Sequence, residues 1–233
     1  MNDIARDGGT LARGVFVTGT DTGIGKTLSS CTLLHALRAR GLRAVGMKPL
    51  ASGCETTPEG LRNEDALALQ AASDPRPAYD DVNPYALPAP LAPEIAAREA
   101  GIAVELAPML AAHARLAAQA DVVVVEGVGG WAAPMAPSLM QADLVRALDV
   151  PVVLVVGLRL GCLNHAMLSA RAITADGCRL AGWIGSGVDP AMLRIDENRA
   201  LLAARLPAPC LGWLPWQAAP DPVALAPSLR LGP

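Results

Sequence analysis

The chain has 233 residues, of which 52% are hydrophobic and 18% are charged, and its formal net charge is −3. This length suits one large α/β domain whose core needs no disulfide or structural metal. The acidic balance and the lack of a basic run argue against nucleic acid as a main partner. The longest apolar stretch, around residues 150–156, is too short to cross a bilayer, so no membrane partner is predicted.

The first residues of the chain, 1–13, carry no apolar signal core, so secretion is not indicated and a flexible tail is predicted. Residues 14–233 are predicted to form a single domain. The five cysteines lie far apart in the sequence, without a C-x-x-C pair. This pattern is typical of reduced thiols rather than of a disulfide framework or a zinc site, and it predicts a cytoplasmic protein.

Short β-branched runs alternate with longer stretches of helical period along the chain. The predicted strands are Val15–Thr18, Ala44–Lys48, Val122–Glu126, Val152–Val156, Leu180–Ile184 and Cys210–Leu214. The predicted helices are Lys26–Arg40, Glu64–Ala72, Val104–Ala120, Met140–Leu148, Leu163–Asp176 and Met192–Leu206. Pro and Gly crowd residues 74–93 and 215–233, which are predicted to be loops. The alternation predicts one doubly wound, mostly parallel sheet flanked by helices, with ligands beyond the C-terminal ends of the strands.

The first predicted strand leads into a glycine-rich turn, Gly19-Thr-Asp-Thr-Gly-Ile-Gly-Lys-Thr27, and then into a helix. In such a P-loop, backbone N–H groups converge on phosphate oxygens at the positive end of the helix. Lys26 is then expected to reach the β- and γ-phosphates, and the Thr27 hydroxyl to ligate Mg²⁺. The spacing departs from the standard motif, because Thr20 occupies the place of its first glycine.

The same loop also fits the dinucleotide-binding turn of short-chain dehydrogenases, which is an alternative interpretation. Those enzymes need a catalytic Tyr-x-x-x-Lys, and here Tyr79 is followed by Asn83 and Tyr85 by Ala89 at that spacing. Hydride transfer is therefore disfavoured.

Two acidic residues are candidates for holding the magnesium of a bound nucleotide. Glu126 ends an apolar strand and is followed by glycines, so it is expected to face the site. Asp65 lies at the predicted start of a helix, where an acid commonly stabilises the helix dipole, and its local pattern alone favours that structural role.

Lysine is rare in this chain: of 19 basic residues, only Lys26 and Lys48 are lysines. Both follow predicted strands on the side where ligands are expected. Lysine is a compact point charge with three free donors, whereas arginine is a rigid planar fork. We therefore predict that Lys48 stabilises charge on a transferring phosphoryl group or on a carboxylate-like substrate.

The segment Gly161–His165 begins a predicted helix, whose N–H groups are suited to an anion. A thiol nucleophile at Cys162, paired with His165, is a weaker interpretation than helix-start packing. His35 and His113 lie in helical stretches without metal-ligand spacing and are expected to be structural.

Seven short motifs together resemble the dethiobiotin synthetase family from about residue 15 to about residue 217. They are G-T-D-T-x-x-G-K-T (Gly19–Thr27), K-P-x-A-S-G (Lys48–Gly53), G-L-R-N-x-D-A (Gly60–Ala66), V-N-P-Y (Val82–Tyr85), E-G-x-G-G-W (Glu126–Trp131), L-G-C-x-N-H-A (Leu160–Ala166) and G-x-x-P-W (Gly212–Trp216). Each motif alone is weak, and their order and spacing make the resemblance specific.

The resemblance implies a P-loop fold and a ligase that converts 7,8-diaminononanoate, CO₂ (from bicarbonate) and ATP into dethiobiotin, ADP and phosphate, with Mg²⁺ as cofactor. It also implies a homodimer with the substrate site at the subunit interface.

The resemblance further implies roles for individual residues. Lys26 and Lys48 are the implied catalytic residues, and Thr27, Asp65 and Glu126 the implied metal ligands, which reverses the local interpretation of Asp65. The implied nucleotide contacts are Gly23, Ile24, Gly25, Lys26, Thr27, Leu28, Asp65, Glu126, Gly127, Val128, Gly129, Ser186, Gly187, Pro215, Trp216 and Gln217. The implied substrate contacts are Thr22, Ser52, Gly129 and Gly130, together with Leu160, Gly161, Cys162 and Asn164 across the interface.

Two departures from the family pattern affect these expectations. Gly23 stands where some relatives carry glutamate, and Gly185-Ser186-Gly187 replaces an Ala-Asn-Asp stretch whose asparagine recognises adenine. A P-loop switch ATPase of the partitioning type is a further alternative. Such proteins carry a second lysine early in the loop, where this chain has Asp21.

Overall fold

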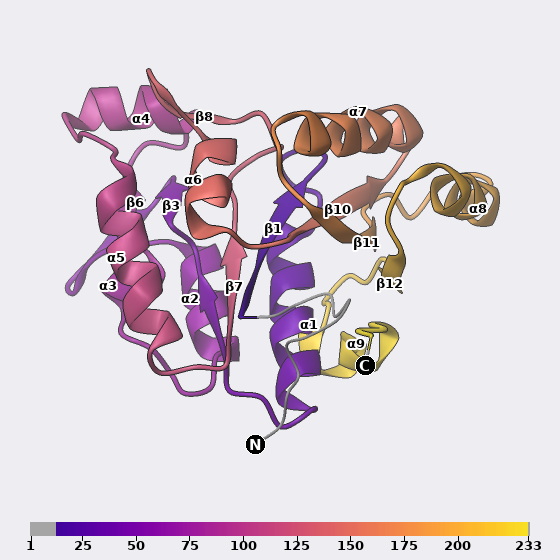
Figure 1. Ribbon diagram of the computed structural model, residues 1–233, viewed down its shortest axis with the longest axis horizontal. Helices are drawn as coiled ribbons and strands as arrows, with labels where there is room; N and C mark the ends of the chain where they lie inside the picture. The colour runs from indigo at the N-terminus through magenta and orange to yellow at the C-terminus, as the bar shows by residue number, and fades with distance from the viewer. Residues whose placement is uncertain (1–12, 233) are drawn as a thin grey trace.

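A six-stranded parallel sheet forms the centre of the computed structural model, which describes residues 13–232 (Figure 1). The predicted tail, residues 1–13, lies outside the described residues except for Arg13. The strands, in their order across the sheet, are β12 (Cys210–Leu214), β11 (Leu180–Gly187), β10 (Val152–Leu158), β1 (Gly14–Gly19), β7 (Val122–Glu126) and β2 (Ala44–Met47). Each neighbouring pair in this order is parallel.

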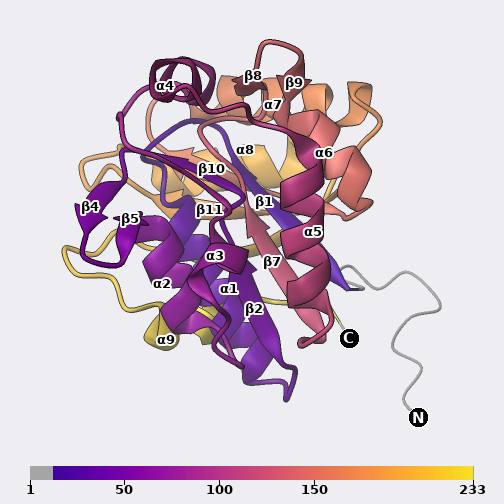
Figure 2. The ribbon, with the colours of Figure 1, turned by 90° about the vertical axis from the view of Figure 1, so that its left-hand side faces the viewer.

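Helices cover both faces of the sheet. Successive side chains of a strand point to opposite faces, and here the side chains on both faces are apolar. On one face, Val15 and Val17 of β1 join a buried cluster with Leu33 and Leu37. That face is covered by α1 (Lys26–Arg38), α2 (Glu64–Ala72) and α9 (Pro222–Leu225). On the other face, Phe16 packs in the cluster of α5 (Leu106–Ala117), α6 (Gln141–Leu148), α7 (Cys162–Ala175) and α8 (Ile195–Arg205) (Figure 2). The predicted fold class is confirmed.

The predicted elements of the sheet and its covering helices are all present. The bounds of α2, β7 and β12 are as predicted, and the others are shifted at one or both ends. β10 and β11 extend further than predicted, to Leu158 and Gly187. The helix predicted from Met192 begins only at Ile195. Lys48 lies just beyond β2, and its backbone N–H donates to the carbonyl of Val82 at 2.7 Å.

The prediction that residues 74–93 and 215–233 are loops is wrong in part, and several short elements were not predicted elsewhere. The short elements are β3 (Leu50–Ser52), β4 (Glu55–Thr57), β5 (Gly60–Arg62), α3 (Tyr79–Val82), β6 (Tyr85–Leu87), α4 (Pro93–Ala100), β8 (Pro134–Ala136), β9 (Leu139–Met140), α9 and the 3₁₀ helix η1 (Ala226–Ser228). Most of them are too short to show a period. β6 forms because it pairs with the distant β3, and α9 begins where the Asp221 carboxylate accepts the Val223 N–H at 2.9 Å.

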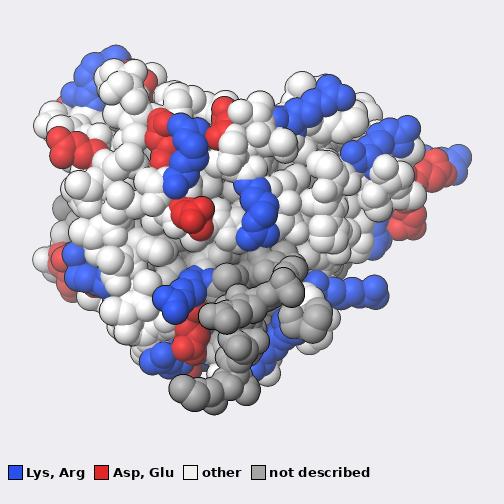
Figure 3. Space-filling model, viewed as in Figure 1, with Lys and Arg blue, Asp and Glu red and all other residues white. Residues whose placement is uncertain are grey.

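The surface of the described residues has two plain features. None of the described helices is long and apolar enough to span a membrane. On the face shown in Figure 3, acidic and basic side chains are interspersed rather than gathered into one area of a single sign.

Candidate active site

A cavity of about 740 Å³ opens at the C-terminal edge of the sheet, where parallel strands place their outgoing loops together. A volume of this size suits a small-molecule ligand. Of the predicted site residues, Thr22, Gly23, Gly25, Lys26, Thr27, Lys48, Ser52, Asp65, Val128, Gly129 and Gly130 line it. Pro90–Pro93 and Ala133–Pro134 form other parts of the lining.

The predicted phosphate loop connects β1 to α1 beside this cavity. Gly23 and Gly25 have φ of 69° and 83°, the left-handed region that favours glycine, and Gly25 directly precedes the first residue of α1. Ile24 is only 1% exposed, and a Cβ at Gly157 would lie 2.6 Å from it. Ile24 therefore anchors the loop on β10, while the first backbone N–H groups of α1 remain available for an anion.

Three oxygen atoms meet at the base of the cavity. The hydroxyl oxygen of Thr27 lies 2.6 Å from Asp65 Oδ1 and 2.9 Å from Glu126 Oε1. A hydroxyl has one proton, so it donates to only one of the two carboxylates at a time. Oxygen atoms this close together suit a small hard cation such as Mg²⁺, which binds oxygen ligands at about 2.1 Å.

Glu126 supplies further evidence that the cluster suits a cation. Its side chain is fully buried, and Glu126 Oε2 has no hydrogen-bond partner among the described residues. A buried carboxylate oxygen without a donor is costly, and a bound metal ion would satisfy it. The residues present therefore fit a magnesium ion.

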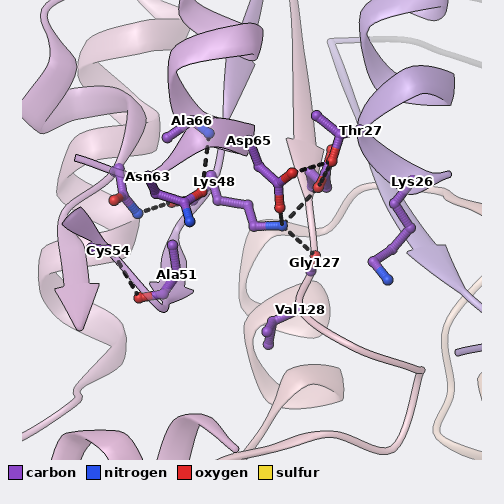
Figure 4. Close-up of polar contacts among 12 residues, drawn as sticks. Lys26, Thr27, Lys48, Ala51, Cys54, Asn63, Asp65, Ala66, Gly127 and Val128 are labelled. Atoms are coloured by element: carbon purple, nitrogen blue, oxygen red, sulfur yellow. Dashed lines mark hydrogen bonds and ion pairs between the residues drawn. The ribbon is translucent and has the colours of Figure 1, made fainter. Parts of the chain in front are cut away.

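Lys48 neutralises the two carboxylates, and it approaches Asp65 from the side away from Thr27 (Figure 4). Its ammonium nitrogen lies 2.7 Å from Glu126 Oε1 and 2.8 Å from Asp65 Oδ2, and it also donates to the carbonyl of Gly127 at 3.3 Å. The side chain is 5% exposed. Burial alone would lower the pKa of Lys48, but Glu126 and Asp65 raise it above the ordinary value. Burial would raise the pKa of Asp65, whereas Lys48 and Thr27 lower it.

Lys26 points away from this cluster (Figure 4). Its ammonium donates instead to the backbone carbonyl of Asp21 at 2.8 Å. Burial and the charge of Lys48 lower the pKa of Lys26 to about 8. No carboxylate of residues 13–232 lies at hydrogen-bond distance from this ammonium, which favours an anionic ligand beside it.

Asp65 reaches the cluster because α2 is fixed at its N-terminus. The Asn63 side chain accepts the Ala66 N–H at 3.2 Å, and the Asn63 N–H donates to the hydroxyl of Tyr79 at 2.8 Å. Asp65 thus occupies the first turn of α2, as its local pattern predicted. The interpretation that it only stabilises the helix is wrong, because its carboxylate contacts both Thr27 and Lys48.

Two supporting residues were not predicted. Gln141, 1% exposed, accepts the Val128 N–H at 2.8 Å and donates to the Gly130 carbonyl at 3.2 Å, so it shapes the glycine segment after β7. Asn83 donates to the carbonyl of Lys48 at 2.7 Å. The sequence around Gln141 gives little indication of its role. Asn83, in contrast, lies within the V-N-P-Y motif.

The predicted base-binding residues lie outside the cavity. Ser186 is 2% exposed and packs beneath the phosphate loop, since a Cβ on Gly25 would lie 2.4 Å from Ser186 Oγ. A Cβ on Gly187 would lie 2.5 Å from the Trp216 nitrogen, so Gly187 and Pro215–Gln217 form a neighbouring segment. Trp216 is 49% exposed.

The residues Leu160–Asn164 also lie outside the cavity lining. Leu160 is 95% exposed and precedes α7, whose N-cap Gly161 has φ of 95°. Cys162 is 1% exposed, and burial raises the pKa of its thiol, which opposes a nucleophilic role. Burial also lowers the pKa of His113 and of His35.

These features together define the class of the protein. A strand, a glycine-rich turn and a helix that starts Lys-Thr, with two carboxylates beside the threonine, make a P-loop nucleotide-binding site. The family model described as "AAA domain" matches residues 13–223.

Curated relatives define the family more closely. The chain is 65% identical to the ATP-dependent dethiobiotin synthetase BioD of Xanthomonas euvesicatoria pv. vesicatoria, over 93% of this chain and 96% of that protein. It is 70% identical to the protein of the same name from Xylella fastidiosa strain 9a5c, over 86% of this chain and 88% of that protein. The chain belongs to the family of ATP-dependent dethiobiotin synthetases.

Solved structures show the same fold at low sequence identity. The MinC:MinD cell division protein complex of Aquifex aeolicus matches with a TM-score of 0.54 at 14% identity, over 89% of this chain and 83% of that chain. Cell division protein ftsY from Thermotoga maritima matches with a TM-score of 0.50 at 17% identity, over 96% of this chain and 71% of that chain. These likenesses concern the fold alone, so the family assignment rests on the sequence relatives.

Proposed function

We propose that this chain converts 7,8-diaminononanoate, CO₂ and ATP into dethiobiotin, ADP and phosphate. The observation that carries the proposal is the cluster of Thr27, Asp65, Glu126 and Lys48, three of which line the cavity, in a chain 65% identical to a dethiobiotin synthetase. Dethiobiotin formation by the purified chain from diaminononanoate, bicarbonate and Mg-ATP is the direct test.

The reaction needs positioning and charge stabilisation more than covalent help from the protein. One substrate amine attacks CO₂ and loses a proton, which gives a carbamate. A carbamate oxygen attacks the γ-phosphorus of ATP and ADP leaves. The second amine then attacks the carbamate carbon and loses a proton, phosphate leaves with the C–O bond electrons, and the ureido ring closes. Phosphorylation is required because phosphate is a much better leaving group than the unactivated carbamate oxygen.

Thr27, Asp65 and Glu126 are the proposed magnesium ligands. Among the described residues, no cluster of three or more His, Cys, Asp or Glu side chains is suited to a metal. The proposed protein ligands are therefore two carboxylates and the threonine hydroxyl. Magnesium sites at nucleotides commonly use one or two carboxylates and take their other ligands from phosphates and water. When bound, the metal supplies positive charge that neutralises the phosphate oxygens during transfer.

The two lysines have distinct proposed roles. Lys48 neutralises Asp65 and Glu126, and a cation at those carboxylates would release its ammonium toward the carbamate and the γ-phosphate. The Lys26 ammonium, which donates to the Asp21 carbonyl, would donate to phosphate oxygens when a nucleotide binds. Thr22 and Ser52 line the same cavity and are proposed to contact the substrate amines or carbamate.

We also propose a homodimer in which Leu160–Asn164 of one protomer receives the substrate carboxylate bound at its partner. The start of α7 presents backbone N–H groups, which suit an anion. In one protomer these residues do not line the cavity, and Leu160 is almost fully exposed. The five cysteines are free, in keeping with a cytoplasmic location.

Discrimination between nucleobases is expected to be weak. Ser186 offers one rotatable hydroxyl where relatives have an asparagine amide, and the amide pairs with an adenine edge through a donor and an acceptor. The loss of one such hydrogen bond is worth about 1 kcal/mol, so kcat/KM for ATP should exceed that for CTP, GTP or UTP by about tenfold at most.

The comparison of kcat/KM for the four nucleotides, in wild type and in Ser186→Asn, measures this preference. Because Ser186 packs beneath Gly25, unchanged affinity for magnesium triphosphate, which carries no base, is the control for an intact loop in the variant. A preference for ATP of about a hundredfold in the wild type contradicts the prediction. So does a nucleotide ranking that the substitution leaves untouched.

A further inference from the structure

Asp21 makes three hydrogen bonds that fix the phosphate loop. Its carboxylate Oδ1 accepts the Thr22 N–H at 2.7 Å, and its backbone carbonyl accepts the Lys26 ammonium at 2.8 Å. Its other carboxylate oxygen, Oδ2, accepts the guanidinium of Arg159. Thr22 and Lys26 both line the cavity, so Asp21 orients two cavity residues from behind.

Arg159 comes from the junction between β10 and α7, and that junction supports the first half of the loop at several points. The Thr20 N–H donates to the carbonyl of Val155 at 3.0 Å, and the Gly157 N–H donates to the Thr20 hydroxyl at 3.3 Å. The Arg159 carbonyl in turn accepts the Cys162 N–H at 3.0 Å, at the first turn of α7. Among these contacts, the one between Asp21 and Arg159 joins two charged side chains.

A carboxylate in a phosphate-binding loop needs an electrostatic explanation, since it repels a triphosphate. The N–H of Thr22 and the guanidinium of Arg159 lower the pKa of Asp21, so the group is ionised at neutral pH. Its side chain is 48% exposed and that of Arg159 is 42% exposed, so the pair adds little to stability. The pair is instead expected to affect the electrostatic potential at the loop, because the positive charge of Arg159 cancels the negative charge of Asp21 there.

We propose that Asp21 and Arg159 are positioning residues for nucleotide binding: Asp21 orients Thr22 and Lys26, and Arg159 holds Asp21 and cancels its charge. The inference rests on nucleotide binding at this loop, which is part of the proposed function. The proposal predicts a specific order of nucleotide affinities among variants. Loss of Arg159 alone should be worse for nucleotide affinity than loss of both charges, because it leaves an uncompensated anion beside the phosphates.

The test measures the dissociation constant of Mg-ADP by calorimetry for wild type, Arg159→Gln, Asp21→Asn and the double variant. Arg194→Gln is the matched control, because it breaks an exposed arginine–carboxylate pair at the start of α8, at 3.1 Å. At low salt we expect Arg159→Gln to weaken binding about tenfold, the double variant to regain most of that loss, and Arg194→Gln to bind as the wild type does. The deficit of Arg159→Gln should shrink as salt increases.

Each outcome decides the proposal. A double variant that binds no better than Arg159→Gln overturns it, as does an Arg159→Gln deficit that is independent of salt, because a purely structural contact gives either result. Since the readout is nucleotide affinity, it is separate from catalysis. A wild type that binds Mg-ADP and forms no dethiobiotin would contradict the proposed function while leaving this inference open to the same comparison.

Discussion

Lys48→Arg is expected to reduce kcat/KM for dethiobiotin formation by about a hundredfold or more, equivalent to about 2.7 kcal/mol of transition-state stabilisation. Lys48 is 4% exposed and its ammonium fits between two carboxylates and a carbonyl. A guanidinium keeps the charge, so the fold should survive. It is larger and planar, however, and cannot move as a point charge from the carboxylates to a phosphoryl group.

Steady-state kinetics and thermal unfolding of the same preparation check this prediction. Turnover near the wild-type rate would remove Lys48 from the catalytic residues. Lys48→Met adds a readout without turnover: Mn²⁺ alone, followed by electron paramagnetic resonance, should bind about tenfold more tightly than to wild type, because the competing ammonium is gone. Lys26→Met is the matched control, since Lys26 contacts the Asp21 carbonyl rather than the carboxylates.

Asp65→Asn and Glu126→Gln are each expected to raise the Mg²⁺ concentration for half-maximal activity at least about tenfold, because a neutral amide is a poor ligand for a hard cation. Glu126→Gln should have the larger effect. Glu126 is fully buried and its Oε2 has no donor within the described part of the chain, whereas the side chain of Asp65 is 33% exposed. Glu126→Gln also removes one of the two carboxylates that neutralise buried Lys48, and breaking such a pair costs about 3–5 kcal/mol.

Mg²⁺ titrations at saturating ATP and diaminononanoate measure the metal requirement, and chemical denaturation checks stability. Glu64→Gln provides a matched control, because it also changes an acid in the first turn of α2 that lines the cavity, without a contact to Thr27 or Lys48 among the hydrogen bonds of the described residues. An unchanged metal requirement in Asp65→Asn or Glu126→Gln would exclude that residue from the metal ligands.

The sheet was predictable because its strands have strong local signals. Continuous β-branched runs such as 122–126 and 152–156 are typical of strands buried on both faces. β3 and β6 lack such a signal, since three residues cannot show a period and each forms by pairing with the other. The start of α8 was misplaced because Arg194, with φ of 54°, breaks the helix that the apolar pattern suggested.

The site was predictable where chemistry follows a strand directly. Lys48 directly follows β2, Glu126 ends β7, and Lys26 begins the helix after the glycine-rich turn of β1, so a parallel sheet brings them to one edge. Asp65 lies on a helix outside the sheet, and only the family resemblance indicated its role. The pairing of Asp21 with Arg159 joins residues 138 positions apart, and no local pattern indicates such a contact.

The central claim is tested most directly by product formation. Purified chain is incubated with 7,8-diaminononanoate, ¹³C-bicarbonate and Mg-ATP, and dethiobiotin is followed by mass spectrometry together with released phosphate. We predict dethiobiotin carrying one ¹³C in its ureido carbonyl, with one phosphate released per molecule, and neither product when ATP or diaminononanoate is left out. Phosphate release that does not depend on diaminononanoate, without labelled dethiobiotin, would contradict the account.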